Sequence, residues 1–321
     1  MNVGVLTVPL SGISLEETLK YLSNLGVGYV EIGTGGFPGH AHANPDVLLN
    51  NHEALKAFRS LMDKYHFKIS ALSCHGNPVH PNVDQAKKDH EAFEKTVLLA
   101  EKLSVETIIT FSGCPGGCKT DQTPNWAISA WPNDFQDILK YQWEDVLVPY
   151  WKKASDFALS HGVKKIALEM HPGFNVYNPE TMLELRAKVG DVIGANFDPS
   201  HLFWQGIDPV LAIKKLGKAI HHFHAKDTQI FMDNVKVNGV LDMKSYANLL
   251  ERSWIFRTVG YGHDANVWKD MISMLRVIGY DGAISIEHED NLMSIHEGLE
   301  KAISFLKDLV IQEQPAEAWW F

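Results

Sequence analysis

Four short stretches of this chain each end an apolar run with carboxylate or imidazole side chains. In chain order they are residues 167–171 (ALEMH), 196–201 (NFDPSH), 222–227 (HFHAKD) and 285–290 (SIEHED). Apolar runs of this length are typical of buried parallel strands, whose carboxyl ends converge on one point in a closed ring. Two Glu, one Asp and one His gathered there would form an oxygen-rich site for a divalent cation. That ligand set suits Mn²⁺, Mg²⁺, Co²⁺ or Zn²⁺, and geometry would select among them.

The candidate metal ligands in these stretches are Glu169, Asp198, His224 and Glu287. A lone carboxylate in an apolar strand, such as Glu169, is costly to bury without a partner, so it needs a specific function or a specific ion pair. His222 and His224 alternate along one predicted strand, and we expect them to point to opposite faces or layers. Only one is then expected to be a ligand, and we choose His224.

Three further polar side chains are expected at the same end of the strands. His201 follows Asp198 by three residues, in the turn, and can face the same cavity. Lys226 lies at the end of the strand that carries His224, and Arg257 is the other nearby cation. We expect all three to bind substrate.

His171 and His75 have two interpretations each. His171 lies two residues past Glu169 on the same strand face, so it is either a catalytic base or shuttle or a hydrogen-bonded supporting histidine. His75 follows the third predicted strand and is either a substrate-binding residue or a plain polar loop residue.

A cation flanked by two carboxylates can act on an α-hydroxyketone or α-hydroxyaldehyde. The cation would hold two substrate oxygens and contribute several kcal/mol to an enediolate-like transition state as a Lewis acid. Glu169 and Glu287 would take and return the proton, and such general acid–base help is typically about 10²–10⁴-fold. Isomerisation, epimerisation and β-elimination next to a carbonyl all share this first step.

Strand-like and helix-like stretches alternate along the whole chain, which favours a single (β/α)₈ TIM barrel of the α/β class. A doubly wound open sheet is the alternative, but it would normally carry a Gly-rich phosphate loop where this chain has residues 7–12 (TVPLSG). The predicted strands are 2–8, 27–33, 67–75, 105–112, 164–170, 192–198, 219–225 and 282–288. The predicted helices are 14–24, 45–65, 84–103, 143–161, 179–189, 208–216, 266–278 and 294–309.

Three long loops follow predicted strands two, four and seven, at residues 33–40, 112–141 and 228–264. Long loops in compact domains usually have a function, and all three would lie on the face that carries the four motifs. The second holds Trp131, which either stacks on a sugar ring or an aglycone or packs the loop onto the barrel. We expect a catalytic domain over 1–312 and an aromatic tail over 313–321.

Bulk composition limits the possible function classes. The 321 residues are 45% hydrophobic and 21% charged, which is typical of a globular protein. The net charge of −10 disfavours a nucleic-acid partner, and no apolar run is long enough to span a membrane. Three cysteines and an N-terminus without a signal sequence indicate a reducing, cytoplasmic location.

The strand-five Glu, the D-x-x-H of strand six, the H-x-H-A-K-D of strand seven and the strand-eight Glu resemble the motifs of the sugar isomerase/epimerase superfamily with the xylose-isomerase-like TIM barrel. The resemblance covers nearly the whole chain. It implies Glu169, Asp198, His224 and Glu287 as metal ligands, acid–base work by the two Glu, and a substrate-orienting role for His201. We expect one divalent ion, Mn²⁺ first, with Mg²⁺, Co²⁺ and Zn²⁺ as alternatives.

Two segments resemble a narrower branch of this superfamily. Residues 252–264 and 285–290 are similar to those of enzymes that cleave 3-oxo-glycosides, including the metal-binding α subunits of C-glycoside deglycosidases. The resemblance implies β-elimination of a sugar or glycoside substrate by a homo-oligomer, or by a hetero-oligomer with a small second subunit. A ketose 3-epimerase or sugar isomerase and an inosose-type dehydratase are alternatives. The family's 3-epimerases place an Arg shortly after the strand-seven His, and residues 225–230 contain none.

Two other functions agree less well with the residues. A DNA-repair enzyme that resembles endonuclease IV needs further metal-binding histidines on strands three and four. Here His75 follows strand three, but the end of strand four (residues 110–113, TFSG) has no histidine. A barrel that only binds sugar is expected to lose a ligand, whereas this chain keeps all four. Since no Gly-rich anion site follows strands seven and eight, we predict a substrate without phosphate.

Overall fold

Eight parallel strands form a closed barrel in the computed structural model, which describes residues 1–313, 317 and 320. The order around the barrel is β1, β2, β3, β4, β5, β6, β7 and β10, and β10 pairs with β1 to close the ring. This arrangement confirms the predicted TIM barrel, and each strand lies inside its predicted range. The bounds are β1 (Asn2–Leu6), β2 (Tyr29–Gly33), β3 (Lys68–Ser73), β4 (Thr107–Phe111), β5 (Lys165–Glu169), β6 (Ile193–Phe197), β7 (Ile220–Ala225) and β10 (Ala283–Ile286).

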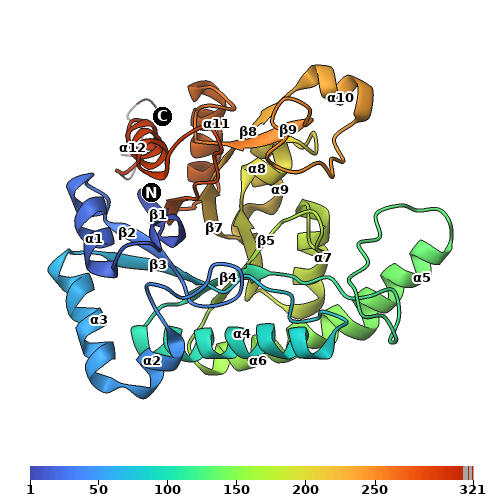
Figure 1. Cartoon of the computed structure of the whole chain (residues 1–321), viewed down its shortest axis with the longest axis horizontal. Coiled ribbons are helices and arrows are strands. Elements are labelled where there is room, and N and C mark those ends of the chain that lie inside the picture. Colours follow the sequence, from blue (N-terminus) through green and yellow to red (C-terminus); the bar gives the residue numbers. More distant parts are fainter. Residues whose placement is uncertain (314–316, 318–319, 321) are drawn as a thin grey trace.

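Helices surround the barrel and connect its strands (Figure 1). The α-helices are α1 (Leu15–Asn24), α2 (Pro45–Asn50), α3 (His52–Lys64), α4 (Val83–Leu103), α5 (Asp134–Lys140), α6 (Val148–Ser160), α7 (Pro179–Val189), α8 (Pro199–Phe203), α9 (Pro209–Leu216), α10 (Met232–Asn238), α11 (Ala265–Val277) and α12 (Ile295–Lys307). Short 3₁₀ turns lie at η1 (Val8–Leu10) and η3 (Gly217–Ala219), and a π-helical segment lies at η2 (Tyr141–Leu147).

Side-chain caps fix where several helices begin. The Ser14 hydroxyl accepts a hydrogen bond from the Glu17 backbone, and the Glu17 carboxylate accepts one from the Ser14 backbone, at the start of α1. The predicted helix 45–65 is divided in two for the same reason. Asn51 adopts an extended conformation, and its side chain accepts a hydrogen bond from Ala54 to start α3 as a separate helix.

The barrel interior is partly polar. A small apolar layer consists of Ala71, Ile109 and Ala167, from β3, β4 and β5. A polar layer lies beside it and contains Glu31, Ser73, Asn196, His222 and Ser285, all buried. The main apolar core lies between the strands and the helices, where Trp151 and Trp268 are fully buried. Most apolar packing is therefore between the strands and the surrounding helices, and the inside of the barrel can hold polar side chains.

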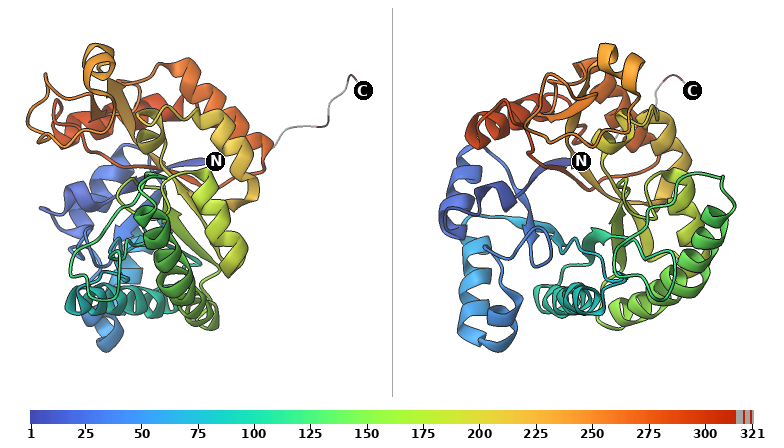
Figure 2. Two further views of the ribbon diagram at one scale, coloured as in Figure 1. Left: turned by 90° about the vertical axis from the view of Figure 1, so that its right-hand side faces the viewer. Right: turned by 45° about the vertical axis from the view of Figure 1, so that its right-hand side comes forward.

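The segment after β7 differs from the long loop that we predicted. It contains β8 (Asp227–Ile230) and β9 (Trp254–Arg257), which pair antiparallel, with α10 between them. Figure 2 shows this orange segment projecting from the barrel. The sequence gives little sign of the pairing, because two four-residue strands far apart in the chain are held mainly by contacts with the rest of the fold. The predicted loop after β4 likewise contains α5.

The N-terminus lies beside the end of the last helix. The Met1 ammonium group donates to Asp281 Oδ1 at 2.6 Å and to the Ile311 carbonyl at 2.9 Å. The predicted tail, with Trp319 and Phe321, lies outside the described residues apart from residues 313, 317 and 320. Among the described residues, no helix is both long and apolar enough to cross a membrane. The predicted oligomer and cytoplasmic location stay predictions.

Candidate metal centre

Four side chains converge at the carboxyl ends of neighbouring strands. Glu169 is the last residue of β5, Asp198 follows β6, His224 lies in β7 and Glu287 follows β10. One ligand atom from each of these residues lies within 4.8 Å of the others. These are the four residues that we predicted as ligands, and the closure of the barrel explains their convergence.

Asp198 is shared between a helix cap and the cluster. Its Oδ1 accepts a hydrogen bond from the Ser200 backbone at 2.8 Å, which caps the short helix α8. Its Oδ2 is buried and makes no hydrogen bond with the residues that the structure describes, although Lys226 Nζ lies at 3.2 Å and His201 Nε2 at 3.3 Å. Buried carboxylate oxygens are normally satisfied. Oδ2 is therefore available to bind a cation.

Glu169 lies in the most crowded part of the cluster. Its Oε2 is 3.0 Å from His75 Nε2 and accepts a hydrogen bond from Asn196 Nδ2 at 3.1 Å, and its Oε1 is 3.1 Å from His201 Nε2. Burial raises the pKa of Glu169, but hydrogen bonds from His201, His224 and His75 outweigh it and hold the pKa well below its usual range. Glu169 is therefore a carboxylate at neutral pH.

His224 connects the cluster to the carboxylate of Glu31. Its Nδ1 lies 3.1 Å from Glu287 Oε2 and 3.3 Å from Glu169 Oε2, and its Nε2 lies 2.8 Å from Glu31 Oε2. Burial lowers the pKa of His224, but the surrounding carboxylates reverse that effect and raise it well above its usual range. A cation that binds at Nδ1 must therefore displace a proton.

Lys226 neutralises much of the negative charge of the cluster. Its Nζ is 2.8 Å from Glu287 Oε2, 3.2 Å from Asp198 Oδ2 and 3.1 Å from Glu289 Oε2. Burial lowers the pKa of Lys226, but these three carboxylates outweigh it and raise the pKa well above its usual range. Burial likewise raises the pKa of Glu287, but the charge of Lys226 holds it far below its usual value. Lys226 and Glu287 are therefore both charged at neutral pH.

His171 lies at the edge of the cluster as a neutral ring. Its Nδ1 is 2.6 Å from the Pro172 carbonyl, which can only accept, so Nδ1 carries the proton and Nε2 is an acceptor. Its ring centroid lies 4.1 Å from that of His201. Burial is the main cause that lowers the pKa of His171 to about 3, and the charge of His201 adds to it.

A cavity of about 510 Å³ opens beside the cluster. Its lining includes His171, Glu289, Phe256 and Tyr246. The Phe256 ring stacks with Tyr246 at a centroid distance of 5.8 Å and lies 4.7 Å from Lys226 Nζ. The cavity therefore has one apolar aromatic wall beside charged groups. A larger cavity of about 650 Å³ is lined by α5 and α7 residues. None of the four candidate ligands lines either cavity, but the smaller one adjoins the cluster through His171, whose ring packs against His201, and through Glu289, which pairs with Lys226.

Two predicted substrate-binding residues lie apart from this cavity. Arg257 is held by Asp290, with Nε 3.1 Å from Oδ2, and by Gln229, with Nη1 2.8 Å from Oε1, so its charge is already used within the fold. Trp131 is 77% exposed on the loop after β4 and does not line the cavity. By contrast, His75, His201 and Lys226 do lie against the cluster.

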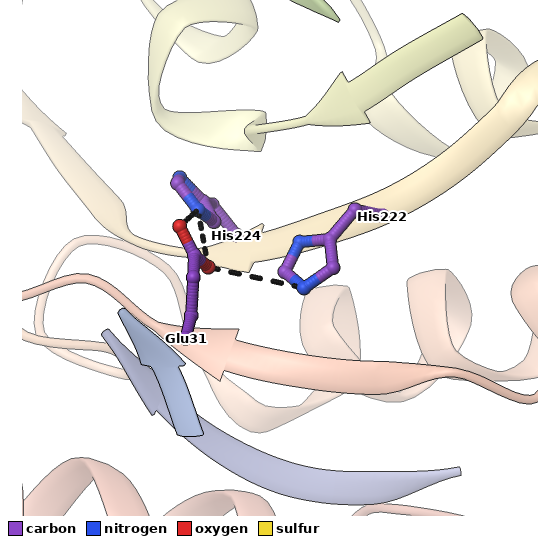
Figure 3. A group of neighbouring side chains, drawn as sticks. All are labelled: Glu31, His222 and His224. Atoms are coloured by element: carbon purple, nitrogen blue, oxygen red, sulfur yellow. Dashed lines mark hydrogen bonds and ion pairs between the residues drawn. The ribbon is translucent and has the colours of Figure 1, made fainter. Parts of the chain in front are cut away.

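One sequence argument about the β7 histidines was partly wrong. His222 and His224 do not point to opposite faces, because residues two apart in a strand share a face. Both approach Glu31 in the barrel interior, at 3.8 Å and 2.8 Å, and they occupy successive layers (Figure 3). Glu31 itself was missed. It is a lone carboxylate in an apolar strand, and the argument applied to Glu169 would have found it.

Comparisons with known proteins agree with this architecture. The family model described as xylose isomerase-like TIM barrel matches residues 19–309. YfiH, an uncharacterized protein of Bacillus subtilis (strain 168), is 40% identical over 314 residues, which cover 97% of this chain and 100% of YfiH.

Solved structures with low sequence identity share the fold. The IOLI protein with a binding zinc atom has a TM-score of 0.67 at 20% identity, over 97% of this chain and 98% of that chain. A D-tagatose 3-epimerase-like protein has a TM-score of 0.64 at 21% identity, over 96% and 98%. A xylose isomerase domain protein from Planctomyces limnophilus has a TM-score of 0.61 at 18% identity, over 96% of both chains. At these identities the likeness extends to the fold alone.

Proposed function

The chain belongs to the xylose isomerase-like TIM barrel family, and from that premise we propose that it is an enzyme that binds one divalent cation and removes a proton next to a sugar carbonyl. The observation that carries this proposal is the convergence of Glu169, Asp198, His224 and Glu287, with ligand atoms within 4.8 Å of one another. Three carboxylates and one imidazole suit Mn²⁺ first, with Mg²⁺, Co²⁺ and Zn²⁺ as alternatives. The zinc atom bound by IOLI supports a divalent ion in a barrel of this fold.

The donor set is consistent with such an ion. Asp198 Oδ2 is buried without a hydrogen bond, and His224 Nδ1 faces two carboxylates. When bound, the cation supplies Lewis-acid polarisation of the substrate carbonyl. The chain's own side chains hold the substrate and move the protons.

Glu169 and Glu287 are the proposed proton acceptor and donor. Their lowered pKa values keep both ionised at neutral pH, so each can accept a proton from carbon and return one. They extend from β5 and from the end of β10, with β6 and β7 between these strands in the barrel, so they approach a bound sugar from two sides.

Three cluster neighbours would orient the substrate. His201 and Lys226 are proposed to donate hydrogen bonds to sugar oxygens. His171 offers Nε2 as an acceptor at the edge of the cluster, and we assign it to a substrate hydroxyl group.

Within this class we propose β-elimination of a 3-oxo-glycoside, including C-glycosides. The C2 proton passes to a carboxylate, and the electrons of the C–H bond form an enediolate across C2 and C3. The carbonyl at C3 then re-forms, a C1–C2 double bond forms, and the bond from C1 to the aglycone breaks. The aglycone leaves with its bonding electrons and takes up one proton. The products are a 3-oxo-1,2-unsaturated sugar and the protonated aglycone.

The cavity supports a substrate larger than a free ketose. It measures about 510 Å³, and its wall of Phe256 and Tyr246 offers an apolar surface on which an aglycone can stack. The nearby cations are already paired, Lys226 with three carboxylates and Arg257 with Asp290. This pairing agrees with the prediction that the substrate carries no phosphate. A sugar phosphate that binds at least about tenfold more tightly than its unphosphorylated form would contradict it.

The test is release of a chromogenic aglycone from a 3-oxo-glucoside. The protein is stripped with a chelator and reloaded with Mn²⁺, Mg²⁺, Co²⁺ or Zn²⁺ in turn. We expect release only with a divalent ion, and loss of release in Glu169→Gln and in Glu287→Gln. Glu106→Gln is the matched control, because Glu106 precedes β4 at the opposite end of the barrel, where its side chain forms an ion pair with the exposed Lys164.

The other members of the class give different outcomes. C3 epimerisation of D-fructose without aglycone release would favour a ketose 3-epimerase. A D-tagatose 3-epimerase-like protein is among the solved structures that share the fold of this chain. Loss of water from an inosose would favour a dehydratase. Absence of bound metal and of all three reactions would reject the proposed function.

A further inference from the structure

Glu31 is a carboxylate buried inside the barrel, beneath the candidate metal centre. It lies in β2, is 0% exposed, and is not one of the four converging ligands. Its two oxygens lie 3.0 and 2.8 Å from His224 Nε2, and Ser285 and Ser73 donate their hydroxyl groups to it. Figure 3 shows Glu31 pointing from its strand to the His224 ring. An unpaired carboxylate this deeply buried would be strongly destabilising, so His224 is its necessary partner.

The two nitrogens of His224 have different partners. Nε2 faces Glu31, and Nδ1 faces Glu169 and Glu287 in the cluster. A carboxylate only accepts hydrogen bonds, so the nitrogen beside Glu31 must carry a proton. Once Nδ1 has lost its proton to a cation, the neutral ring has its single proton on Nε2. The lone pair then points into the cluster, in the orientation that a metal ligand needs.

We propose that Glu31 is a positioning residue that holds the His224 ring in the Nε2–H tautomer and thereby sets the affinity of the centre for its cation. The inference rests on the proposed metal site. It adds a residue that affects metal affinity without touching the metal or the substrate. A carboxylate behind a ligating histidine also makes the ligand nitrogen more basic. Loss of such a partner typically lowers metal affinity about 10–100-fold.

A second cation between Glu31, His222 and His224 is the competing interpretation. Ligand atoms of these three residues lie within 4.8 Å of one another. Their polar atoms are already engaged with one another and with neighbours, however. His222 Nδ1 lies 3.1 Å from Asn196 Oδ1 and its Nε2 lies 3.4 Å from Ser70 Oγ. A second cation would have to displace these hydrogen bonds and those at Glu31.

The experiment measures metal binding by the whole chain, with cobalt and zinc as probes. Affinity and stoichiometry come from competition with a chromophoric chelator. We expect one ion per wild-type chain and an affinity about 10–100-fold weaker in Glu31→Gln. Ser70→Ala is the matched control, because the hydroxyl group of Ser70 bonds to His222 and to the Val30 carbonyl and not to the side chain of Glu31 or His224. We expect its affinity to equal that of the wild type.

Two further readouts separate positioning from a general loss of structure. The visible spectrum of bound cobalt should change in Glu31→Gln but not in Ser70→Ala. In the zinc-loaded protein, the Nε2 proton of His224 should give a strongly downfield NMR signal that moves upfield in Glu31→Gln. If Glu31→Gln does not fold, Glu31→Asp retains the charge but shortens the side chain by one carbon. We expect it to weaken binding in the same direction.

The outcomes are distinguishable. A wild-type chain that binds no divalent ion would reject the proposed function and this inference together. A wild-type chain that binds one ion, with equal affinity and an unchanged cobalt spectrum in Glu31→Gln, would reject only the role of Glu31. Two ions in the wild type and one in Glu31→Gln would make Glu31 a ligand and overturn its positioning role.

Discussion

At the scale of single residues, the site depends on how each charge is balanced. Glu169 is surrounded mainly by imidazoles, whereas Glu287 is paired with Lys226. Both are ionised for different reasons, since hydrogen bonds lower the pKa of Glu169 and a full positive charge lowers that of Glu287. In the metal-free protein, Lys226 supplies part of the positive charge that a cation would bring.

Replacing Lys226 tests this balance. Lys226→Met leaves the buried carboxylate of Asp198, the largely buried one of Glu287 and the exposed one of Glu289 without their shared cation. We expect the metal-free protein to lose about 3–5 kcal/mol of unfolding free energy. Manganese should restore more stability to Lys226→Met than to the wild type, because the uncompensated carboxylates gain more from a cation. Urea unfolding with and without Mn²⁺ measures both effects. Lys214→Met, on the exposed face of α9, is the control. An equal gain of unfolding free energy on adding Mn²⁺ to the wild type and to Lys226→Met would contradict the proposal that Lys226 balances the charge of the carboxylates.

The sequence predicted the four converging residues but not what surrounds them. Glu169, Asp198, His224 and Glu287 follow apolar runs, and strand order alone brings them together. Glu31 was missed, although it is a lone carboxylate in an apolar strand like Glu169. Asn196 could not be identified, because its importance depends on which groups face it across the barrel. Arg257 and Trp131 were assigned to the substrate because of their type and place in the chain, but side-chain pairing and exposure decide where such groups act.

At the scale of elements, Asp227 fixes the segment that borders the cavity. Its Oδ2 accepts hydrogen bonds from the backbone of Gly260, Gly262 and His263 and lies 3.3 Å from Trp268 Nε1. It is fully buried at the start of β8, next to Lys226. One carboxylate thus joins the end of the barrel, the segment after β9 and helix α11.

Asp227→Asn tests this role. An amide cannot replace all the acceptor sites of the carboxylate, so we expect the unfolding free energy to fall by about 2–3 kcal/mol. The midpoint of urea unfolding measures the loss. Asp233→Asn is the matched control, because Asp233 is exposed on α10 in the same segment. Equal midpoints for the two variants would show that Asp227 does not hold the segment together.

The elements divide into those that the sequence could and could not predict. Barrel strands are apolar runs with helices between them, and all eight were found. The sequence did not predict the pairing of β8 with β9, because that pairing depends on tertiary contacts. It also did not predict the division between α2 and α3, because one capping side chain, Asn51, produces it.

At the scale of the whole molecule, the barrel buries several neutral histidines. Burial is the main cause that lowers the pKa of His171 to about 3 and those of His221 and His222 to about 4. In an unfolded chain each would titrate near about 6.5. The unfolded state therefore binds more protons between these values, and stability must fall as pH decreases below about 6.5.

This linkage gives a prediction for the metal-free protein. Each histidine contributes up to about 1.4 kcal/mol of lost stability per pH unit in the window from about 6.5 to about 4. His224, whose pKa is raised, stays protonated in the folded state across this window, so it adds only a small opposing slope near the unfolded pKa of about 6.5. His221→Asn should reduce the slope of unfolding free energy between about pH 6.5 and pH 5, because it removes one of the three groups. A slope of zero in the wild type would contradict the burial of neutral imidazoles.

The central claim is that this barrel removes a proton next to a sugar carbonyl with the help of a divalent ion. The most direct test uses NMR to follow exchange of the C2 proton of a 3-oxo-glucoside with deuterated solvent. The protons next to the carbonyl groups of D-fructose and of an inosose are followed in parallel. We predict loss of the C2 signal only with the metal-loaded protein, and not with Glu169→Gln or Glu287→Gln. Retention of every proton next to a carbonyl in all three compounds, with the metal bound, would contradict the claim.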